Sequence, residues 1–134
     1  MSRVRDAMIT EPRSLPATAS AQAAGDVLTP AEVRAVYVVD GDGGLVGVVT
    51  RKTLVASVVA AGRDPRSTTL LEIAEPPYYT LDPELELEDA FRFIEQADAE
   101  RVPVVEQGRL IGVVSRAVLQ RRLAEDEPAA EPPE

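Results

Sequence analysis

Residues 36–50 read VYVVDGDGGLVGVVT, which is an apolar run, a turn rich in Gly and Asp, and a second apolar run that stops at Thr50. Residues 102–115 read VPVVEQGRLIGVVS and repeat this pattern with a turn one residue shorter. Valine and isoleucine suit a pleated strand better than a helix, and Gly with Asp favours a tight turn. Each stretch is therefore predicted to form a β-hairpin, and the chain contains an internal repeat.

A glycine lies inside the second strand of both predicted hairpins, at Gly47 and Gly112. Glycine weakens a strand, so its presence there usually marks a bulge or a close approach by a backbone or a ligand. Because both copies have it, we expect the shape of the repeat to require it.

The first copy has further predicted elements on both sides of its hairpin. Apolar spacing and prolines predict a helical turn at 2–9, a short strand at 13–15 and a helix at 17–28. After the hairpin, a helix is predicted at 51–61 and Gly62 is expected to end it.

The second copy predicts the same order of strand, helix, strand, strand and helix. A helical turn is expected at 70–73, a short strand at 78–81, a helix opening at Asp82–Pro83, and a last helix at 116–123. The fold class is therefore α/β of the α+β type. The buried stripe of the helix after Pro83 is predicted to be Leu87, Ala90, Ile94 and Ala97.

The domain organisation follows from the repeat. Residues 1–123 are expected to form one paired unit, with repeats at 4–62 and 70–123 and a linker at 63–69. A single unit of about 60 residues is marginally stable alone, so the two copies are expected to share a core. Residues 124–134 are acidic and proline-rich and are predicted to be a disordered tail.

Composition disfavours several functions. The net charge is −9, and residues 72–100 hold ten acidic side chains and one basic one, which argues against nucleic-acid binding. No apolar run approaches the ~20 residues of a membrane span and no signal-peptide core is present, so a cytoplasmic protein without a membrane partner is expected.

Catalysis and metal binding also have little support in the sequence. With no His and no Cys, the chain lacks the usual general base, a thiol nucleophile and a His/Cys metal cluster. We therefore predict no enzyme activity, no catalytic residues and no metal site. The DGDGG segment at 40–44 resembles part of a calcium loop, but it lacks the loop's final glutamate and closes a hairpin.

The doubled pattern resembles the cystathionine beta-synthase (CBS) domain family, which is found as tandem pairs called Bateman modules. The resemblance covers residues 4–123 and rests on VRDAMIT at 4–10, the two hairpins, and the segments LVGVVT and LIGVVS that end them. It implies two repeats packed sheet to sheet about a pseudo-twofold axis. It also implies a free-standing, non-catalytic regulatory module whose inter-repeat clefts bind AMP, ADP, ATP or S-adenosylmethionine, with no required cofactor.

In the family pattern a Ser or Thr follows the second hairpin strand, and an Asp three residues later binds the ribose hydroxyls. Thr50 and Ser115 keep the hydroxyl, but Thr53 and Val118 stand where the Asp is expected. A hydroxyl makes a weaker bond than a carboxylate, and valine makes none. The resemblance therefore implies a weakened first site and a second site without its ribose partner.

Each candidate ligand residue also has a structural interpretation. The two hydroxyl residues are predicted helix N-caps whether or not a ligand binds. The cations beside them either lie on a solvated face or contact a phosphate, and the tyrosines either pack in the core or stack on a base. The candidates are Thr50, Arg51, Lys52, Thr53, Ser115, Arg116, Tyr78 and Tyr79.

Two functions remain open from the sequence. The first is a sensor that binds an adenine nucleotide or other adenosyl ligand and regulates a partner protein that the sequence does not identify. The second is a ligand-free dimeric interaction scaffold that has lost ribose binding. Either would form a homodimer through the helix at 51–61, whose apolar face is predicted to be Leu54, Val55, Val58 and Val59.

Overall fold

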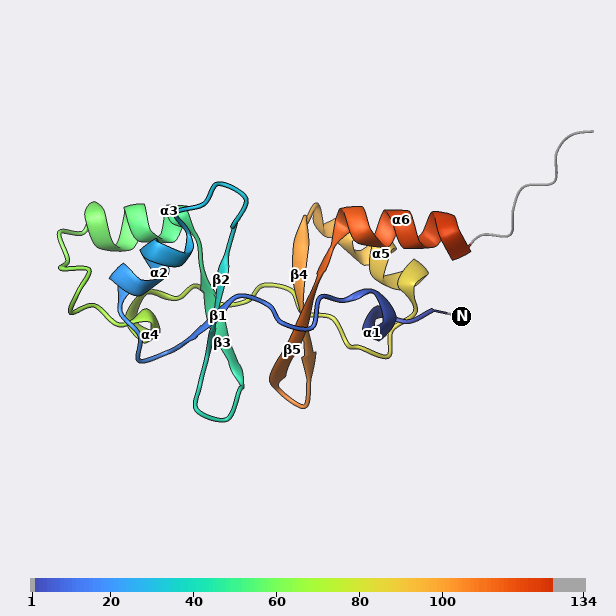
Figure 1. The fold of residues 1–134 in the computed structure, drawn as a ribbon, viewed down its shortest axis with the longest axis horizontal. Coiled ribbons are helices and arrows are strands. Elements are labelled where there is room, and N and C mark those ends of the chain that lie inside the picture. The colour runs from blue at the N-terminus through green and yellow to red at the C-terminus, as the bar shows by residue number, and fades with distance from the viewer. Residues whose placement is uncertain (1, 127–134) are drawn as a thin grey trace, which may run out of the picture. The chain divides into compact units, whose positions relative to one another are not determined.

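The computed structural model describes residues 2–126, which fold into two compact units (Figure 1). Unit 1 contains residues 2–11, 79–106 and 111–126 of the described chain, and unit 2 contains residues 12–78 and 107–110. Each unit has its own hydrophobic core. The compact units therefore do not coincide with the two sequence repeats.

Unit 2 is built on a three-stranded sheet in the order β1-β2-β3. The first strand pairs in parallel with the second, and the second and third form the antiparallel hairpin read from the sequence. The hairpin register shifts between Val38 and Val39. The elements are β1 (Ser14–Pro16), α2 (Ala21–Val27), β2 (Val36–Val39), β3 (Leu45–Val49), α3 (Arg51–Leu54), the π-helix η1 (Val55–Val59) and α4 (Leu70–Ile73).

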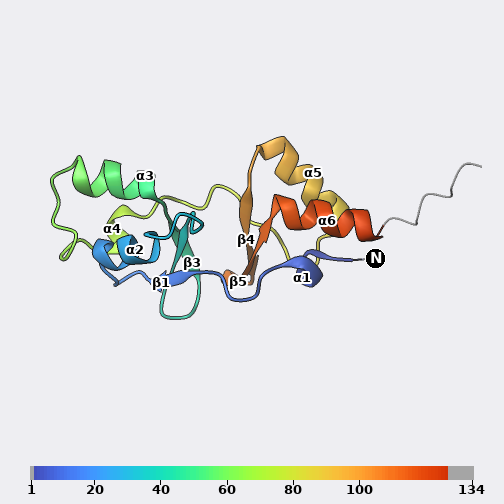
Figure 2. The same ribbon diagram turned by 45° about the horizontal axis from the view of Figure 1, so that its top comes forward.

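Unit 1 contains most of the second hairpin, whose strands form a two-stranded sheet, while the turn at residues 107–110 belongs to unit 2. Its two longer helices lie side by side in both ribbon views (Figure 1, Figure 2). The hairpin turns at Gln107 and Gly108, both with positive φ, as a tight turn between twisted strands requires. The elements are α1 (Val4–Ala7), α5 (Leu87–Ala97), β4 (Arg101–Glu106), β5 (Arg109–Ser115) and α6 (Arg116–Asp126).

The two short helices pack against the core of the other repeat. Val4 of α1 is fully buried in unit 1 among residues of the second repeat, such as Leu87 and Leu119. Leu70 of α4 is fully buried in unit 2 among residues of the first repeat, such as Leu28 and Val36. Each such burial contributes about 1.5–3 kcal/mol to stability. Each unit therefore includes a short helix that belongs to the other sequence repeat.

The interior glycines allow a close approach by a backbone, which is one of the alternatives that the sequence left open. In unit 2, a Cβ on Gly47 would lie 2.6 Å from the carbonyl oxygen of Glu75 and 2.9 Å from Ala74 Cβ. In unit 1, a Cβ on Gly112 would lie 2.8 Å from the carbonyl oxygen of Ile9. At both places a short segment after α4 or α1 forms an antiparallel bridge with the hairpin strand. A side chain at either glycine would push that segment off the sheet.

Several predicted boundaries were wrong. Residues 78–81 do not form a strand, because only Leu81 pairs, through a single parallel bridge to Val104. The helix expected from Asp82 begins at Leu87, and the one expected from Ala17 begins at Ala21, where Ser20 supplies the N-cap.

The last two helices of the repeats also differ from their predictions. The helix expected at 51–61 is an α-helix only as far as Leu54 and then continues as the π-helix η1. Gly62 follows it with a φ of 71°, as expected for the residue that ends a helix. The last helix extends to Asp126, so residues 124–126 are not a disordered tail. The predicted disorder of residues 127–134 lies outside the described residues.

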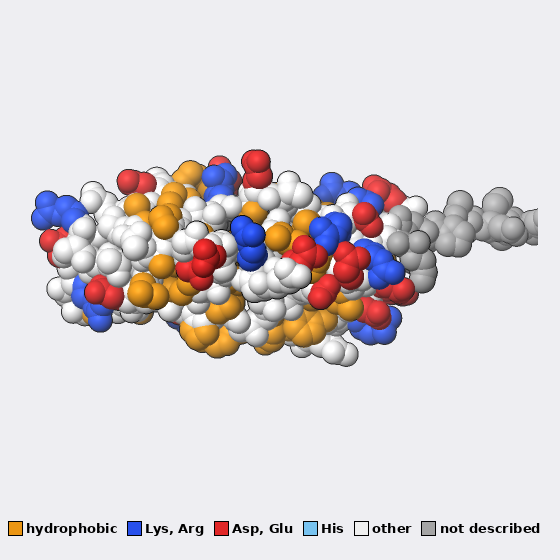
Figure 3. Space-filling model, turned by 90° about the horizontal axis from the view of Figure 1, so that it is seen from below, with side chains coloured by type: hydrophobic (Ala, Val, Ile, Leu, Met, Phe, Trp, Pro, Cys, Tyr) orange, Lys and Arg blue, Asp and Glu red, His pale blue; other side chains and the backbone are white. Residues whose placement is uncertain are grey.

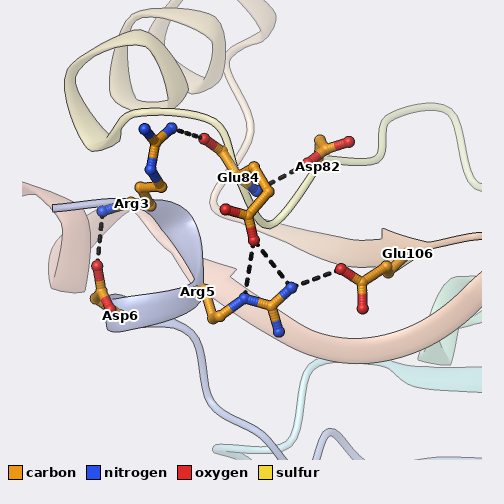
Figure 4. Close-up of polar contacts among 6 residues, drawn as sticks. All are labelled: Arg3, Arg5, Asp6, Asp82, Glu84 and Glu106. Carbon is orange, nitrogen blue, oxygen red and sulfur yellow. Dashed lines mark hydrogen bonds and ion pairs between the residues drawn. The ribbon is translucent and has the colours of Figure 1, made fainter.

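Charged side chains fix α1 within unit 1. The Arg5 guanidinium contacts the carboxylates of both Glu84 and Glu106 (Figure 4). These contacts raise the pKa of Arg5, and the hydrogen bond to Glu84 contributes most. The Arg3 guanidinium donates to the Glu84 carbonyl, and Asp6 accepts from the Arg3 backbone. The sequence did not reveal this pairing.

Acidic and basic side chains are interspersed on the face drawn in Figure 3. Such a distribution offers no continuous basic track on that face, in line with the acidic composition. Within residues 2–126, no helix is long and apolar enough to cross a membrane.

Candidate functional site

The start of α3 in unit 2 is fixed by a reciprocal capping arrangement. The Thr50 hydroxyl accepts from the Thr53 N–H at 3.3 Å, and the Thr53 hydroxyl oxygen accepts from the Thr50 N–H at 3.0 Å. The two hydroxyl oxygens are 3.1 Å apart. The predicted N-cap role of Thr50 is therefore confirmed, and the arrangement satisfies N–H groups that a helix start leaves without partners.

A carboxylate lies beside this capping arrangement. Thr53 is 1% exposed, and its hydroxyl donates to the Oε1 atom of Glu75 at 3.3 Å. Glu75 is half-buried and pairs through its backbone with Val48 of β3, with both N···O distances 2.9 Å. The other carboxylate oxygen of Glu75 has no hydrogen-bond partner within residues 2–126. Thus a partly accessible acceptor lies beside the first turn of α3.

The two cations of α3 have different surroundings. The Arg51 guanidinium donates to the carbonyl oxygens of Leu28 and Pro30, where the chain leaves α2. Lys52 is exposed and makes no hydrogen bond or ion pair with residues 2–126. Arg51 therefore joins α3 to the end of α2, while the Lys52 ammonium group faces solvent.

The start of α6 in unit 1 has fewer polar groups. The Ser115 hydroxyl accepts from the Val118 N–H at 3.1 Å, which confirms its predicted N-cap role. Arg116 forms ion pairs with Asp98 at 3.6 Å and Glu100 at 3.7 Å. Its charge is thus already balanced by two carboxylates of the same unit.

The two tyrosines do not share an environment. Tyr78 belongs to unit 2 and is 74% exposed, so the core-packing alternative fails for it. Tyr79 belongs to unit 1, is 43% exposed, and packs edge-on against Phe93 with ring centroids 5.5 Å apart. Tyr37, by contrast, is buried.

Of the eight predicted ligand residues, the structure brings four together around the start of α3, namely Thr50, Arg51, Lys52 and Thr53. Sequence reasoning missed Glu75, which joins this group from the segment after α4. A signal was available in the comparison of the two repeats. Glu75 pairs with β3 in unit 2, and the equivalent residue that pairs with β5 in unit 1 is the apolar Ile9. The two copies are otherwise similar, so the acidic Glu75 at a position where the other copy has an apolar residue could have been recognised as a candidate site residue.

A hollow lies elsewhere in unit 2. A pocket of about 620 Å³ is lined by the hairpin turn at 40–44 and by residues 107–109, and none of the eight predicted ligand residues lines it. The Asp40 carboxylate there accepts from the N–H groups of Asp42 and Gly44, both at 2.9 Å, so it stabilises its own turn. Residues 2–126 contain no group of three or more His, Cys, Asp or Glu placed to hold a metal ion.

The family model described as the CBS domain matches residues 4–60 and again residues 70–125. Two matched copies in one chain define a paired CBS module. The chain belongs to the CBS domain family, as the sequence pattern predicted.

Known relatives support this assignment. Hypoxic response protein 1 of Mycobacterium tuberculosis is 30% identical over 103 residues, which cover 77% of this chain and 72% of that protein. A crystal structure of Hypoxic Response Protein I with two coordinated zinc ions has a TM-score of 0.78 and 27% identity, and the match covers 91% of this chain and 99% of that one.

Two structures with bound ligands share the fold. The structure of CBSX2 in complex with AMP has a TM-score of 0.76 and 24% identity, covering 93% of this chain and 98% of that one. The CBS domain pair of MJ0100 in complex with 5′-methylthioadenosine and S-adenosyl-L-methionine has a TM-score of 0.71 and 21% identity, covering 95% and 99%.

Proposed function

We propose that this paired CBS module is a non-catalytic regulator that binds an adenine nucleotide, or another adenosyl compound such as S-adenosylmethionine, beside the start of α3 in unit 2. The observation that carries the proposal is the polar group formed by Thr50, Lys52 and Glu75, which offers a hydroxyl, a cation without a partner among the described residues and an accessible carboxylate. Fold relatives with bound AMP or S-adenosylmethionine support the ligand class.

The start of α6 is the weaker candidate within the same proposal. Val118 replaces the hydroxyl of Thr53, and Arg116 is already paired with two carboxylates. A nucleotide phosphate would have to compete with those carboxylates for the guanidinium. The first repeat is therefore proposed as the site of higher affinity.

A thermal-shift series with adenosine, AMP, ATP and S-adenosylmethionine tests the proposal. A ligand present at 100 times its dissociation constant should stabilise the fold by about 2.7 kcal/mol. Lys52→Ala should weaken ATP more than adenosine, because the lost contact is with phosphate. Arg34→Ala is the matched control, since Arg34 is an exposed cation of unit 2 without a polar contact among the described residues. If none of the ligands shifts the melting temperature, the sensor is rejected.

A homodimeric scaffold is the second candidate, and one specific observation favours it. Val55 and Val59 of η1 are 59% and 73% exposed, while Val58 between them is buried in the core. The apolar face predicted for this helix is thus divided, and its exposed half is free to contact a second copy. Large exposed apolar side chains on one helix face are typical of interaction surfaces.

Sedimentation tests the dimer. The chain has a mass of 14.4 kDa, and a dimer is expected at tens of micromolar. Val55→Glu combined with Val59→Glu should convert it to a monomer without unfolding, because neither side chain lies in the core. A parent protein that sediments as a monomer would reject the scaffold but not the sensor. We also propose a cytoplasmic location, because adenine nucleotides are abundant there, and regulation of a partner protein in that compartment.

A further inference from the structure

One polar pair in unit 2 has an apolar counterpart in unit 1. The Thr53 hydroxyl contacts Glu75 at the start of α3. At the start of α6 the corresponding positions hold Val118 and Ile9. We infer that Glu75, oriented by Thr53, is the acceptor for the sugar hydroxyls of the bound ligand, and this inference rests on the function proposed above.

The contacts of Glu75 make it a fixed acceptor with one oxygen available. Its backbone is held to Val48 by two hydrogen bonds of 2.9 Å, and its Oε1 atom accepts the Thr53 hydroxyl at 3.3 Å. Because Thr53 is 1% exposed and its rotamer is fixed by Thr50, the carboxylate is oriented by groups that do not move freely. The second oxygen has no partner within residues 2–126 and is open to a ligand.

The fold does not require this pair. Unit 1 builds the same antiparallel bridge, between Ile9 and Val113, and starts α6 directly after the strand with only apolar residues at the two positions. Placing a carboxylate in a half-buried position has a desolvation cost. The Thr53 hydroxyl also completes the helix cap, but the Glu75 carboxylate at this one helix start is better explained by recognition than by folding.

The chemistry of the pair favours a diol over a phosphate. A carboxylate repels a phosphate but accepts strong hydrogen bonds from hydroxyl groups. Thr53 already donates its only hydroxyl proton to Glu75, so the pair presents acceptors to the ligand. Vicinal hydroxyls of a ribose are donors of the matching kind, whereas a 2′,3′-dideoxyribose offers none.

Calorimetry with two probes tests the inference. AMP and 2′,3′-dideoxyadenosine monophosphate are titrated into the parent, Glu75→Gln and the matched control Glu32→Gln. Glu32 is an exposed carboxylate of unit 2 without a polar contact among the described residues. Glutamine at 75 keeps an acceptor for Thr53, so the fold is expected to persist, and the melting temperature of each variant checks this.

The parent and the control should bind AMP roughly tenfold more tightly than the dideoxy probe, and Glu75→Gln should lose most of that preference, because a charged acceptor becomes a neutral one. If AMP binds and Glu75→Gln keeps the full preference, the role of Glu75 is overturned while the sensor function stands. If the parent binds neither probe nor any other adenosyl ligand, both proposals fall together.

Discussion

The starts of α3 and α6 have the same backbone arrangement but different chemistry. Each follows the second strand of a hairpin, has a hydroxyl N-cap at Thr50 or Ser115, and lies beside a bridge that an interior glycine permits. Around the first are a buried threonine and the carboxylate of Glu75, and around the second are Val118 and Ile9. The features present at both helix starts are those that the repeat needs in order to fold, whereas Thr53 and Glu75 are present at only one of them.

The glycines give the largest expected effect, and they test the shared part of the comparison. Gly47→Ala should destabilise the protein by about 3 kcal/mol, because the new Cβ would lie 2.6 Å from a backbone oxygen that cannot move alone. Gly112→Ala should cost somewhat less, about 2 kcal/mol, since its nearest neighbour at 2.7 Å is the flexible Met8 thioether. Urea unfolding measures both.

A loss below about 0.5 kcal/mol in either glycine variant would contradict the close packing. Gly41→Ala serves as the control, because a Cβ at that position would meet no atom within 4 Å.

A second prediction concerns the polar pair that only unit 2 has. The family pattern has an Asp where Thr53 stands, but an Asp here would face the Glu75 carboxylate at close range. We expect Thr53→Asp to destabilise the fold by about 2 kcal/mol, since two carboxylates in a poorly solvated position repel each other. Adding Glu75→Gln should recover most of the loss in thermal unfolding at pH 7. Equal stability of the single and double variants would show that the two side chains do not interact.

The caps give a smaller difference between the two helix starts. Thr50→Ala should cost about 1.5 kcal/mol and Ser115→Ala about 0.5–1 kcal/mol. The first removes one half of a reciprocal capping arrangement, while the second removes one hydrogen bond to Val118. Chemical denaturation of both variants under one condition provides the comparison. The reverse order would mean that the second hydroxyl of the Thr50–Thr53 pair adds nothing to the cap.

The smallest effect is expected in the loop that leads to α4. The pKa of Asp64 is lowered, first by the backbone N–H of Arg66 and then by its side chain. A carboxyl whose pKa is lower in the folded state adds stability above its unfolded pKa and loses it as the pH falls through the folded value. Asp64→Asn should therefore lower the melting temperature slightly at pH 7, and this difference should disappear as the pH falls through the lowered folded-state pKa of Asp64. If the melting temperatures of the parent and Asp64→Asn differ by the same amount at every pH, the effect comes from the changed side-chain packing and not from the carboxylate charge.

Much of the fold was predictable because its signals are local. Glycine, aspartate and β-branched residues specified the hairpins, and the doubled spacing of Gly47 and Gly112 correctly indicated a close approach by a backbone. The N-cap roles of Thr50 and Ser115 also depend on residues three positions apart. Patterns of this range can be read directly from a sequence.

The remaining features depend on contacts between distant segments. The binding of Arg51 to the carbonyl oxygens of Leu28 and Pro30, and the placement of Glu75 beside Thr53, both require the folded chain. Of the strand expected at 78–81, only Leu81 pairs with another strand, through one bridge. A residue with high β propensity forms a strand only where the fold places a second strand beside it.

The exchange of α1 and α4 between the repeats sets an order for folding during synthesis. The buried core of unit 2, from Ala21 to Ile73, is complete once the first 78 residues have left the ribosome. Val4 must wait for partners as late as Leu119. At about 5–20 residues per second, this wait lasts roughly ten seconds. The first residues made are thus among the last to be buried, and a ribosome-bound chain stopped once residue 78 has emerged from the exit tunnel should carry a folded core of unit 2 behind an N-terminal segment still open to protease.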